Sequence, residues 1–234
     1  MATISENIQE LHRRMAAACL RAGREQQTLT LLTVSKTFPG SAVREAFAAG
    51  ERHFGENYVQ EGLAKIEELA DLREQIQWHL IGPLQSNKTK PVAAAFDWVH
   101  SVDRLKIAER LSEQRPAGLA PLQICLQVNI SGEASKSGLA PAEVPGLARA
   151  VAALPRLRLR GLMAIPEPAS DAAAQRLPHR ALRELLQRVN AEAGLQLDTL
   201  SMGMSADMEA AIAEGATMVR VGSAIFGQRH YPSA

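Results

Sequence analysis

The sequence is poor in several features that would narrow the class of protein at once. Its 234 residues include two cysteines, and aromatic residues make up 4% of the chain. No stretch approaches the roughly 18 consecutive apolar residues that a membrane-spanning helix needs. The N-terminus has no basic segment followed by an apolar run, as a secretory signal would have. These absences argue against secretion and membrane insertion, so we expect a protein of the reducing cytoplasm.

No charge of one sign dominates either. The chain has 26 lysines and arginines against 25 aspartates and glutamates, a net charge of +1. Such a balance produces no overall field for nucleic acid or anionic membranes, so we expect neither as a partner, and it favours a monomer. Cys19 and Cys125 lie in apolar settings without metal-ligand spacing. We therefore expect two buried thiols and no metal site.

What the sequence does contain is a regular alternation of short apolar runs and longer amphipathic segments. An amphipathic helix comes first, with Ile4, Ile8, Leu11 and Met15 at helical spacing. Strands follow, each separated from the next by a helical segment. The predicted strands cover residues 28–36, 52–57, 77–82, 97–102, 122–130, 159–165, 199–204 and 218–225.

Alternating strands and helices are typical of a parallel sheet. Eight such units predict an α/β protein with a closed (β/α)₈ TIM barrel as a single domain over residues 1–234, and an open doubly wound sheet is the alternative. The few residues after Ile225 cannot form an eighth outer helix. We expect the N-terminal helix, within residues 1–25, to pack on the barrel at that place. The proline-rich segment 166–180 is the expected mobile loop.

In a TIM barrel, function lies where the strands end at their carboxyl side. Lys36 ends the first predicted strand and shares a face with Leu32 and Val34, so its amine follows two apolar side chains. Taken alone, such a lysine is more often a solvated tip than a reactive group. Further polar or small residues stand at the other strand ends: Asn57, His79, Asn129, Ser205, Arg220, Gly222 and Ser223.

The last two units predict an anion site. Ser205 is a candidate N-cap of the acidic helix that follows SMGMSAD, and Gly222 with Ser223 offers close backbone approach and a hydroxyl. Barrels often bind phosphate in this region. Arg220 points inward by strand alternation and needs a partner, for which an ion pair with Glu56 is the structural interpretation. An amine beside a phosphate site indicates a phosphorylated aldehyde, because a neutral amine forms a Schiff base with a carbonyl.

Seven motifs in order carry a family resemblance: SKTFP, FGENYVQE, WHLIGPLQSNK, VNISGEASKSG, LRGLMAIP, LSMGMSADMEAAI and MVRVGSAIFG. Together they resemble the pyridoxal 5′-phosphate homeostasis (YggS/PROSC) family over nearly the whole chain. That family is similar to the barrel domain of fold-type III pyridoxal-phosphate enzymes such as alanine racemase. The resemblance implies that pyridoxal 5′-phosphate (PLP) is held as a Schiff base on Lys36.

The resemblance also implies a set of further PLP-binding residues. Arg220 would face the pyridine nitrogen, Asn57 would lie beside the ring, and the phosphate would be held near Ser205. The full implied set is Lys36, Asn57, His79, Asn129, Met204, Ser205, Arg220, Gly222 and Ser223. Lys136 matches a position with a secondary or transfer role, whereas a second site at Lys88 or Lys90 stays open. Some relatives carry a second lysine where this chain has Phe38.

Carriage of PLP is the leading hypothesis for function. Arginine only donates hydrogen bonds, so a ring nitrogen opposite Arg220 stays unprotonated and carbanion stabilisation is weaker. Racemases of this fold nevertheless use such an arginine, so Arg220 does not exclude catalysis. A two-base racemase also needs a second proton carrier, and neither Tyr58 nor Tyr231 is a convincing one. We therefore expect a PLP homeostasis protein without catalysis of its own. It would affect amino-acid and keto-acid balance and contact apo PLP enzymes transiently.

Two enzymatic alternatives stay open at this point. One is a PLP-dependent amino-acid racemase of the alanine racemase type. The other is an aldolase that forms a Schiff base between Lys36 and a sugar phosphate. Visible absorbance of a PLP adduct in the purified protein would argue against the aldolase.

Overall fold

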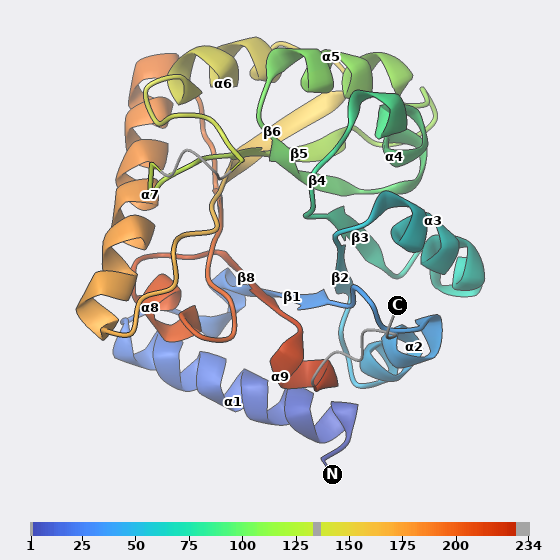
Figure 1. The fold of residues 1–234 in the computed structure, drawn as a ribbon, viewed down its shortest axis with the longest axis vertical. Helices are drawn as coiled ribbons and strands as arrows, with labels where there is room; N and C mark the ends of the chain where they lie inside the picture. The colour runs from blue at the N-terminus through green and yellow to red at the C-terminus, as the bar shows by residue number, and fades with distance from the viewer. Residues whose placement is uncertain (1, 133–136, 228–234) are drawn as a thin grey trace, which may run out of the picture.

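The computed structural model describes residues 2–132 and 137–227. At its centre lies a closed barrel of parallel strands in chain order (Figure 1). The predicted (β/α)₈ barrel is confirmed, and the open-sheet alternative is wrong, because β8 pairs with β1 from Thr30–Met218 to Thr33–Val221. The strands are β1 Thr30–Val34, β2 His53–Glu56, β3 Gln77–Leu80, β4 Trp98–Val102, β5 Leu122–Gln127, β6 Leu157–Met163, β7 Thr199–Ser201 and β8 Met218–Val221.

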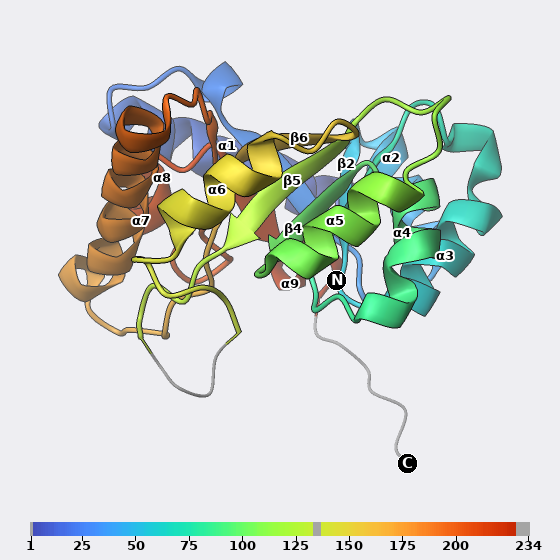
Figure 2. The ribbon, with the colours of Figure 1, turned by 90° about the horizontal axis from the view of Figure 1, so that it is seen from above.

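Helices cover the outside of the barrel. Figure 2 shows α4, α5 and α6 on the side formed by β4, β5 and β6. The apolar faces of the outer helices and strands form one continuous core between the two layers. The helices are α1 Ile4–Arg21, α2 Gly40–Ala48, α3 Val59–Glu68, α4 Thr89–Ala95, α5 Leu105–Gln114, α6 Val144–Ala152, α7 Ala172–Ala193, α8 Met208–Ala213 and α9 Ser223–Phe226, with 3₁₀ turns at Gln26–Thr28, Ala70–Leu72 and Ser86–Lys88.

Helix α1 completes the outer ring beside the last strand. It begins with a capping box, in which the Thr3 hydroxyl accepts from the Glu6 amide and the Glu6 carboxylate accepts from the Thr3 amide. Its apolar face is buried against α8, α9 and α2 (Figure 1). The Asn7 side chain donates to the Ile225 carbonyl at 2.8 Å. The start of the chain therefore lies directly against its last described helix.

Several predicted boundaries are wrong. Strands β1, β5 and β7 end at Val34, Gln127 and Ser201, before the predicted residues 36, 130 and 204, so Lys36 lies in the loop after β1. Helix α7 begins at Ala172, inside the segment expected to be a mobile loop, because the Asp171 side chain caps it by accepting from the Ala174 amide at 2.8 Å. Pro178 lies inside this helix and has no amide hydrogen to donate to the preceding turn. Strand β8 ends at Val221 rather than residue 225, since the chain turns at Gly222 into α9.

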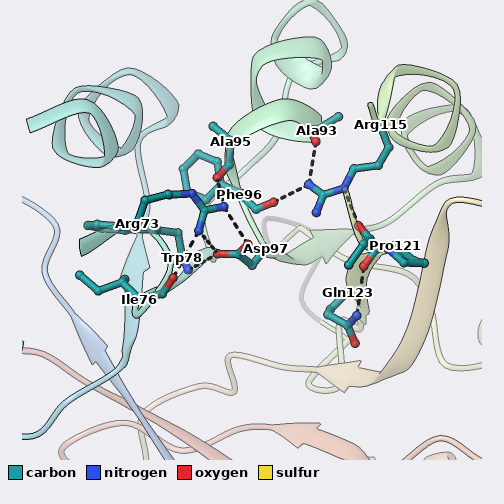
Figure 3. Close-up of polar contacts among 11 residues, drawn as sticks. Arg73, Ile76, Trp78, Ala93, Ala95, Phe96, Asp97, Arg115, Pro121 and Gln123 are labelled. Carbon is teal, nitrogen blue, oxygen red and sulfur yellow. Dashed lines mark hydrogen bonds and ion pairs between the residues drawn. The ribbon is translucent and has the colours of Figure 1, made fainter. Parts of the chain in front are cut away.

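Arginines close the amino-terminal side of β3, β4 and β5 (Figure 3). The guanidinium of Arg73 donates to both carboxylate oxygens of Asp97, at 3.0 and 2.8 Å. Asp97 also accepts from the Trp78 amide at 2.8 Å. Arg115 donates to the carbonyls of Ala93 and Phe96, both at 2.7 Å. At this end of the barrel the two arginines thus make structural contacts, to the Asp97 carboxylate and to backbone carbonyls.

Within residues 2–132 and 137–227, no helix is long and apolar enough to cross a membrane, and no cluster of His, Cys, Asp and Glu could hold a metal ion. Cys19 and Cys125 are buried thiols, as the sequence predicts. Burial raises the pKa of the Cys125 thiol to about 12.

Candidate functional site

A cavity of about 520 Å³ lies where the strands end at their carboxyl side. It takes its lining from segments that are far apart in the sequence, brought together by closure of the barrel. Eight of the residues implied by the sequence line it: Lys36, Asn57, Asn129, Met204, Ser205, Arg220, Gly222 and Ser223. Apolar side chains of Val34, Ile81, Val128 and Ile165 line it as well.

His79 is the exception, and the structure corrects its placement. Its side chain is fully buried and is not part of the cavity lining. The ring stacks on Trp98, with 5.2 Å between ring centroids. Side chains alternate along a strand, so the residue that shares its face one step nearer the mouth is Ile81, which does line the cavity. His79 therefore lies one layer too deep to contact a ligand there.

Two hydroxyls meet on the β7–β8 side of the cavity. The Oγ atoms of Ser205 and Ser223 lie 3.3 Å apart. The prediction that Ser205 caps the next helix is wrong: Asp207 precedes α8, and its carboxylate accepts from the Met204 amide at 2.7 Å. The Ser205 hydroxyl instead faces the cavity with that of Ser223. Such a pair can donate to an anion.

Gly222 lets β8 approach β1 closely beside these hydroxyls. A Cβ atom at Gly222 would lie 2.7 Å from the carbonyl oxygen of Val34, closer than such atoms pack. Val34 also lines the cavity, two residues before Lys36. A larger residue at position 222 would therefore push apart β1 and β8, which lead to Lys36 and Ser223.

Arg220 lies in the floor of the cavity, with hydrogen bonds to neutral acceptors. It donates to the carbonyl and hydroxyl oxygens of Ser201 at 2.5 and 2.9 Å and to the Ala164 carbonyl at 2.8 Å. The expected ion pair with Glu56 is wrong, because Glu56 pairs with Lys65 at 2.8 Å. Burial lowers the pKa of the Arg220 guanidinium to about 10, so it stays protonated at neutral pH.

A chain of hydrogen-bonded side chains leads away from Arg220 through the barrel. The Ser201 hydroxyl is 2.8 Å from Nδ1 of His100, whose Nε2 is 2.9 Å from Nδ1 of His79. Nε2 of His79 is in turn 3.0 Å from Nδ1 of His53. Burial lowers the pKa of His100 to about 3, and the charge of Arg220 adds to this shift. Burial also lowers the pKa of His79 well below its usual value. The histidine chain is therefore neutral at physiological pH.

Several functional candidates were not recognised in the sequence. Ile81, Gln127 and Ile165 line the cavity but carry no reactive group that would single them out. Ser201 and His100 act behind the cavity, and their contacts join strands that are remote in the sequence. Strand alternation could have found Ile81, whereas the other contacts depend on the stagger of the barrel.

Of the three lysines considered for a second PLP site, the structure describes two. Lys136 lies outside the described residues, so its predicted role stays a prediction. Lys88 and Lys90 lie at the start of α4 and do not line the cavity.

Those aromatic candidates that the structure describes do not line the cavity. Tyr58 is 56% exposed, and Tyr231 lies outside the described residues. Phe38 stacks on Phe226 of α9 with 4.8 Å between ring centroids. Where some relatives carry a lysine, this chain thus has an apolar contact between the β1 loop and the last described helix.

Comparisons with known proteins agree with this geometry. The alanine racemase N-terminal domain family matches residues 2–230. The chain is 64% identical over 231 residues to a pyridoxal phosphate homeostasis protein of Pseudomonas aeruginosa, covering 99% of this chain and 98% of that protein. The chain belongs to the pyridoxal phosphate homeostasis protein family. A solved structure of PipY from Synechococcus elongatus with PLP bound is similar at a TM-score of 0.83 and 39% identity, covering 96% of this chain and 100% of that one.

Outside this homeostasis family the likeness is one of fold. An alanine racemase from Corynebacterium glutamicum is similar at a TM-score of 0.67 and 18% identity. The match covers 99% of this chain and 62% of the racemase chain. The homeostasis family therefore shares its barrel architecture with the larger enzyme.

Proposed function

We propose that this protein binds PLP in the cavity at the carboxyl ends of the strands, holds it covalently through Lys36, and stores and delivers it without catalysis of its own. The observation that carries the proposal is the composition of the cavity. An amine, a pair of hydroxyls and a buried guanidinium line the same space of about 520 Å³. A volume of this size falls within the range of about 300–1,000 Å³ that is typical of small-molecule sites.

The donor set fits this cofactor. When bound, PLP supplies an aldehyde that a lysine amine captures with loss of water, and a conjugated ring that can accept electrons. Lys36 supplies the amine, while Ser205 and Ser223 can donate to the phosphate. Arg220 can donate to the ring nitrogen, and Ile81 and Ile165 supply apolar surface for the ring.

The environment of Arg220 favours carriage over catalysis. Its guanidinium stays protonated and can only donate, so a ring nitrogen opposite it remains unprotonated. An unprotonated ring accepts electrons poorly, which weakens carbanion chemistry. The hydrogen bonds from Arg220 to Ser201 and Ala164 hold the guanidinium in this position.

The described lining also lacks the usual partners for two-base chemistry. Among its described residues there is no Tyr, His, Cys, Asp or Glu to exchange a proton on the far side from Lys36. Met204 and Ser223 are exposed, so the site is accessible to solvent and to other proteins. Access from outside suits delivery of the cofactor to apo enzymes that depend on PLP.

The proposal is tested by trapping the cofactor. Wild-type protein incubated with PLP is reduced with borohydride and digested, and the labelled peptide is mapped by mass spectrometry. We expect the label on Lys36, loss of the label in Lys36→Ala, and full labelling in the control Lys106→Ala, which removes an exposed lysine of α5. Labelling of Lys36→Ala at the wild-type level contradicts the proposal.

Two assays separate carriage from enzymatic activity. Exchange of the α-proton of amino acids at an enzymatic rate would indicate a racemase. Borohydride trapping of a sugar phosphate on Lys36, in protein that does not bind PLP, would indicate an aldolase. A carrier shows neither, yet transfers PLP to an apo enzyme in a mixed incubation.

A further inference from the structure

Lys36 lies in a tight turn that its own sequence does not favour. The Phe38 amide donates to the Ser35 carbonyl at 3.1 Å, so Lys36 and Thr37 are the central residues of a four-residue turn. Thr37 has a φ of 68°, a region that suits glycine or asparagine and that β-branched residues rarely adopt. It is the one non-glycine residue with a positive φ in the part of the chain that the structure describes. Contacts from outside the turn must therefore hold it.

Two residues of α3 supply these contacts. The Glu61 carboxylate accepts from the Thr37 amide at 2.5 Å. Lys65, one helical turn further, donates from Nζ to the Ser35 carbonyl at 2.7 Å. The two side chains also bond to each other at 2.7 Å. The peptide groups on both sides of Lys36 are thus held by one pair of side chains, which we call the α3 clamp.

The clamp is anchored in the barrel by Glu56. Its Oε1 accepts from Lys65 at 2.8 Å and from the Ser35 hydroxyl at 2.6 Å. Glu56 is fully buried and Lys65 is 5% exposed. A buried ion pair of this kind contributes little to stability compared with apolar side chains of similar size. Its hydrogen bonds do, however, fix the backbone at the residue before Lys36.

We propose that Glu61 and Lys65 are positioning residues, which hold the Lys36 turn so that its amine is presented to the cavity in the orientation that captures the cofactor aldehyde. The inference rests on the proposed function of the cavity. The clamp acts on the backbone of the turn, and neither Glu61 nor Lys65 lines the cavity. Loss of the clamp should therefore slow formation of the covalent link at Lys36 and leave the hydroxyls of Ser205 and Ser223 unaffected.

Glu61→Ala is the main test, because it removes the acceptor for Thr37 and leaves Lys65 paired with Glu56. We expect the rate of the borohydride-reducible link with PLP to fall about tenfold or more, as is usual when a reacting group is misplaced. The dissociation constant of pyridoxine 5′-phosphate, which has no aldehyde, should stay within about twofold because that ligand uses only non-covalent contacts. In the protein without cofactor, hydrogen exchange at the Thr37 amide should become faster.

Two rescue variants exclude a merely structural effect. Glu61→Gln keeps an acceptor oxygen and should restore the rate. Adding Thr37→Asn to Glu61→Ala should recover at least about threefold, because asparagine tolerates the positive φ without the clamp. Glu67→Ala, an exposed change on the same helix, is the control and should react like the wild type.

The outcomes are distinguishable from a failure of the proposed function. If wild-type protein forms no link at Lys36, the proposed function fails, whatever the variants do. If the wild type forms the link and Glu61→Ala forms it at the same rate, the positioning inference is wrong. It is equally wrong if Glu61→Ala is slow but neither Glu61→Gln nor Thr37→Asn recovers any rate. Thermal unfolding of each variant shows whether it is folded during the measurement.

Discussion

Two polar clusters, one beside Lys36 and one behind Arg220, differ in charge. The cluster beside Lys36 is ionic, with Lys65 between Glu56 and Glu61. The cluster behind Arg220 consists of neutral groups, Ser201 and the histidine chain. The ionic cluster acts on the backbone of a turn, whereas the neutral one holds a charged side chain. A covalent anchor needs a fixed backbone, while a permanent cation needs acceptors that leave its charge available.

The difference appears in the pKa shifts. Burial raises the pKa of Glu56, although Lys65 opposes this shift. Burial also lowers the pKa of Arg220 and of His100. The ionic cluster therefore depends on a compensating charge, while the neutral cluster avoids charge except on Arg220. The following predictions test this contrast, from the largest expected effect to the smallest.

Removal of the buried cation should have the largest effect. Lys65→Met leaves Glu56 without its cation, and we expect a loss of about 3–5 kcal/mol in the free energy of unfolding. Adding Glu56→Gln should recover about half of that loss or more, because the two sites interact directly. Urea unfolding followed by circular dichroism measures both. Lys106→Met on the surface of α5 is the matched control, and an equal loss there would contradict the prediction.

Breaking the neutral cluster should lower the free energy of unfolding by less than Lys65→Met does. Ser201→Ala removes one acceptor of Arg220 and the hydroxyl beside His100, for which we expect a loss of about 1–3 kcal/mol. The Ser201 carbonyl remains as an acceptor for the guanidinium. Ser201→Thr keeps the hydroxyl and serves as the comparison. A larger loss than that of Lys65→Met would reverse the proposed order of the two clusters.

The neutral cluster should also make stability depend on pH. His100 has a pKa of about 3 when folded and about 6.5 when unfolded, so its contribution is present above pH 6.5 and is lost as the pH falls toward 3. The free energy of unfolding should fall by up to about 1.4 kcal/mol per pH unit from this residue. In His100→Gln the free energy of unfolding should therefore depend less steeply on pH between pH 6.5 and 5.

His12 provides a control of opposite sign. Its hydrogen bond to Glu51 raises the pKa of its imidazole, so its contribution is present at low pH and is lost as the pH rises. His12→Gln should therefore make the fall in stability on acidification steeper. If the free energy of unfolding depended less steeply on pH in both histidine variants, the opposite directions of the two pKa shifts would be contradicted.

The hydroxyl pair lies outside both clusters and should give the smallest effect. Ser205→Ala removes one donor from the cavity, so we expect about 1 kcal/mol weaker PLP binding, or about fivefold. Binding of pyridoxal, which lacks the phosphate, should be unchanged. Spectroscopic titration of both ligands measures this, and equal weakening for the two would contradict a phosphate site at Ser205.

Much of the fold could be predicted because its signals are local. The alternation of apolar strands and amphipathic helices depends on residues within one element, and it predicted the barrel in the observed order. The same alternation placed Arg220 on an inward face, whereas Lys36 lines the cavity from the turn after β1. The start of helix α7 was harder to predict, because the nearby prolines are typical of a loop while the Asp171 side chain caps a helix.

Polar partners were harder to predict because they come from different strands and helices. Glu56 was a plausible partner for Arg220 on charge alone, yet the stagger of the barrel places it beside Lys65. The imidazole of His79 is a suitable group for a ligand site, but the side chain lies too deep in the barrel to line the cavity. A sequence motif gives the type of residue, whereas the depth of its side chain in the barrel depends on how all eight strands pair.

The sequence by itself determined the strand order, the amine that follows β1, and the small and hydroxyl residues that follow β7 and β8. These follow from periodicity within single elements, which any closed barrel of this chain must respect. Only the tertiary structure decided that Glu61 and Lys65 hold the Lys36 turn and that neutral side chains hold Arg220. Such contacts depend on where helices and strands lie relative to one another, because a hydrogen bond is lost over a shift of about one ångström.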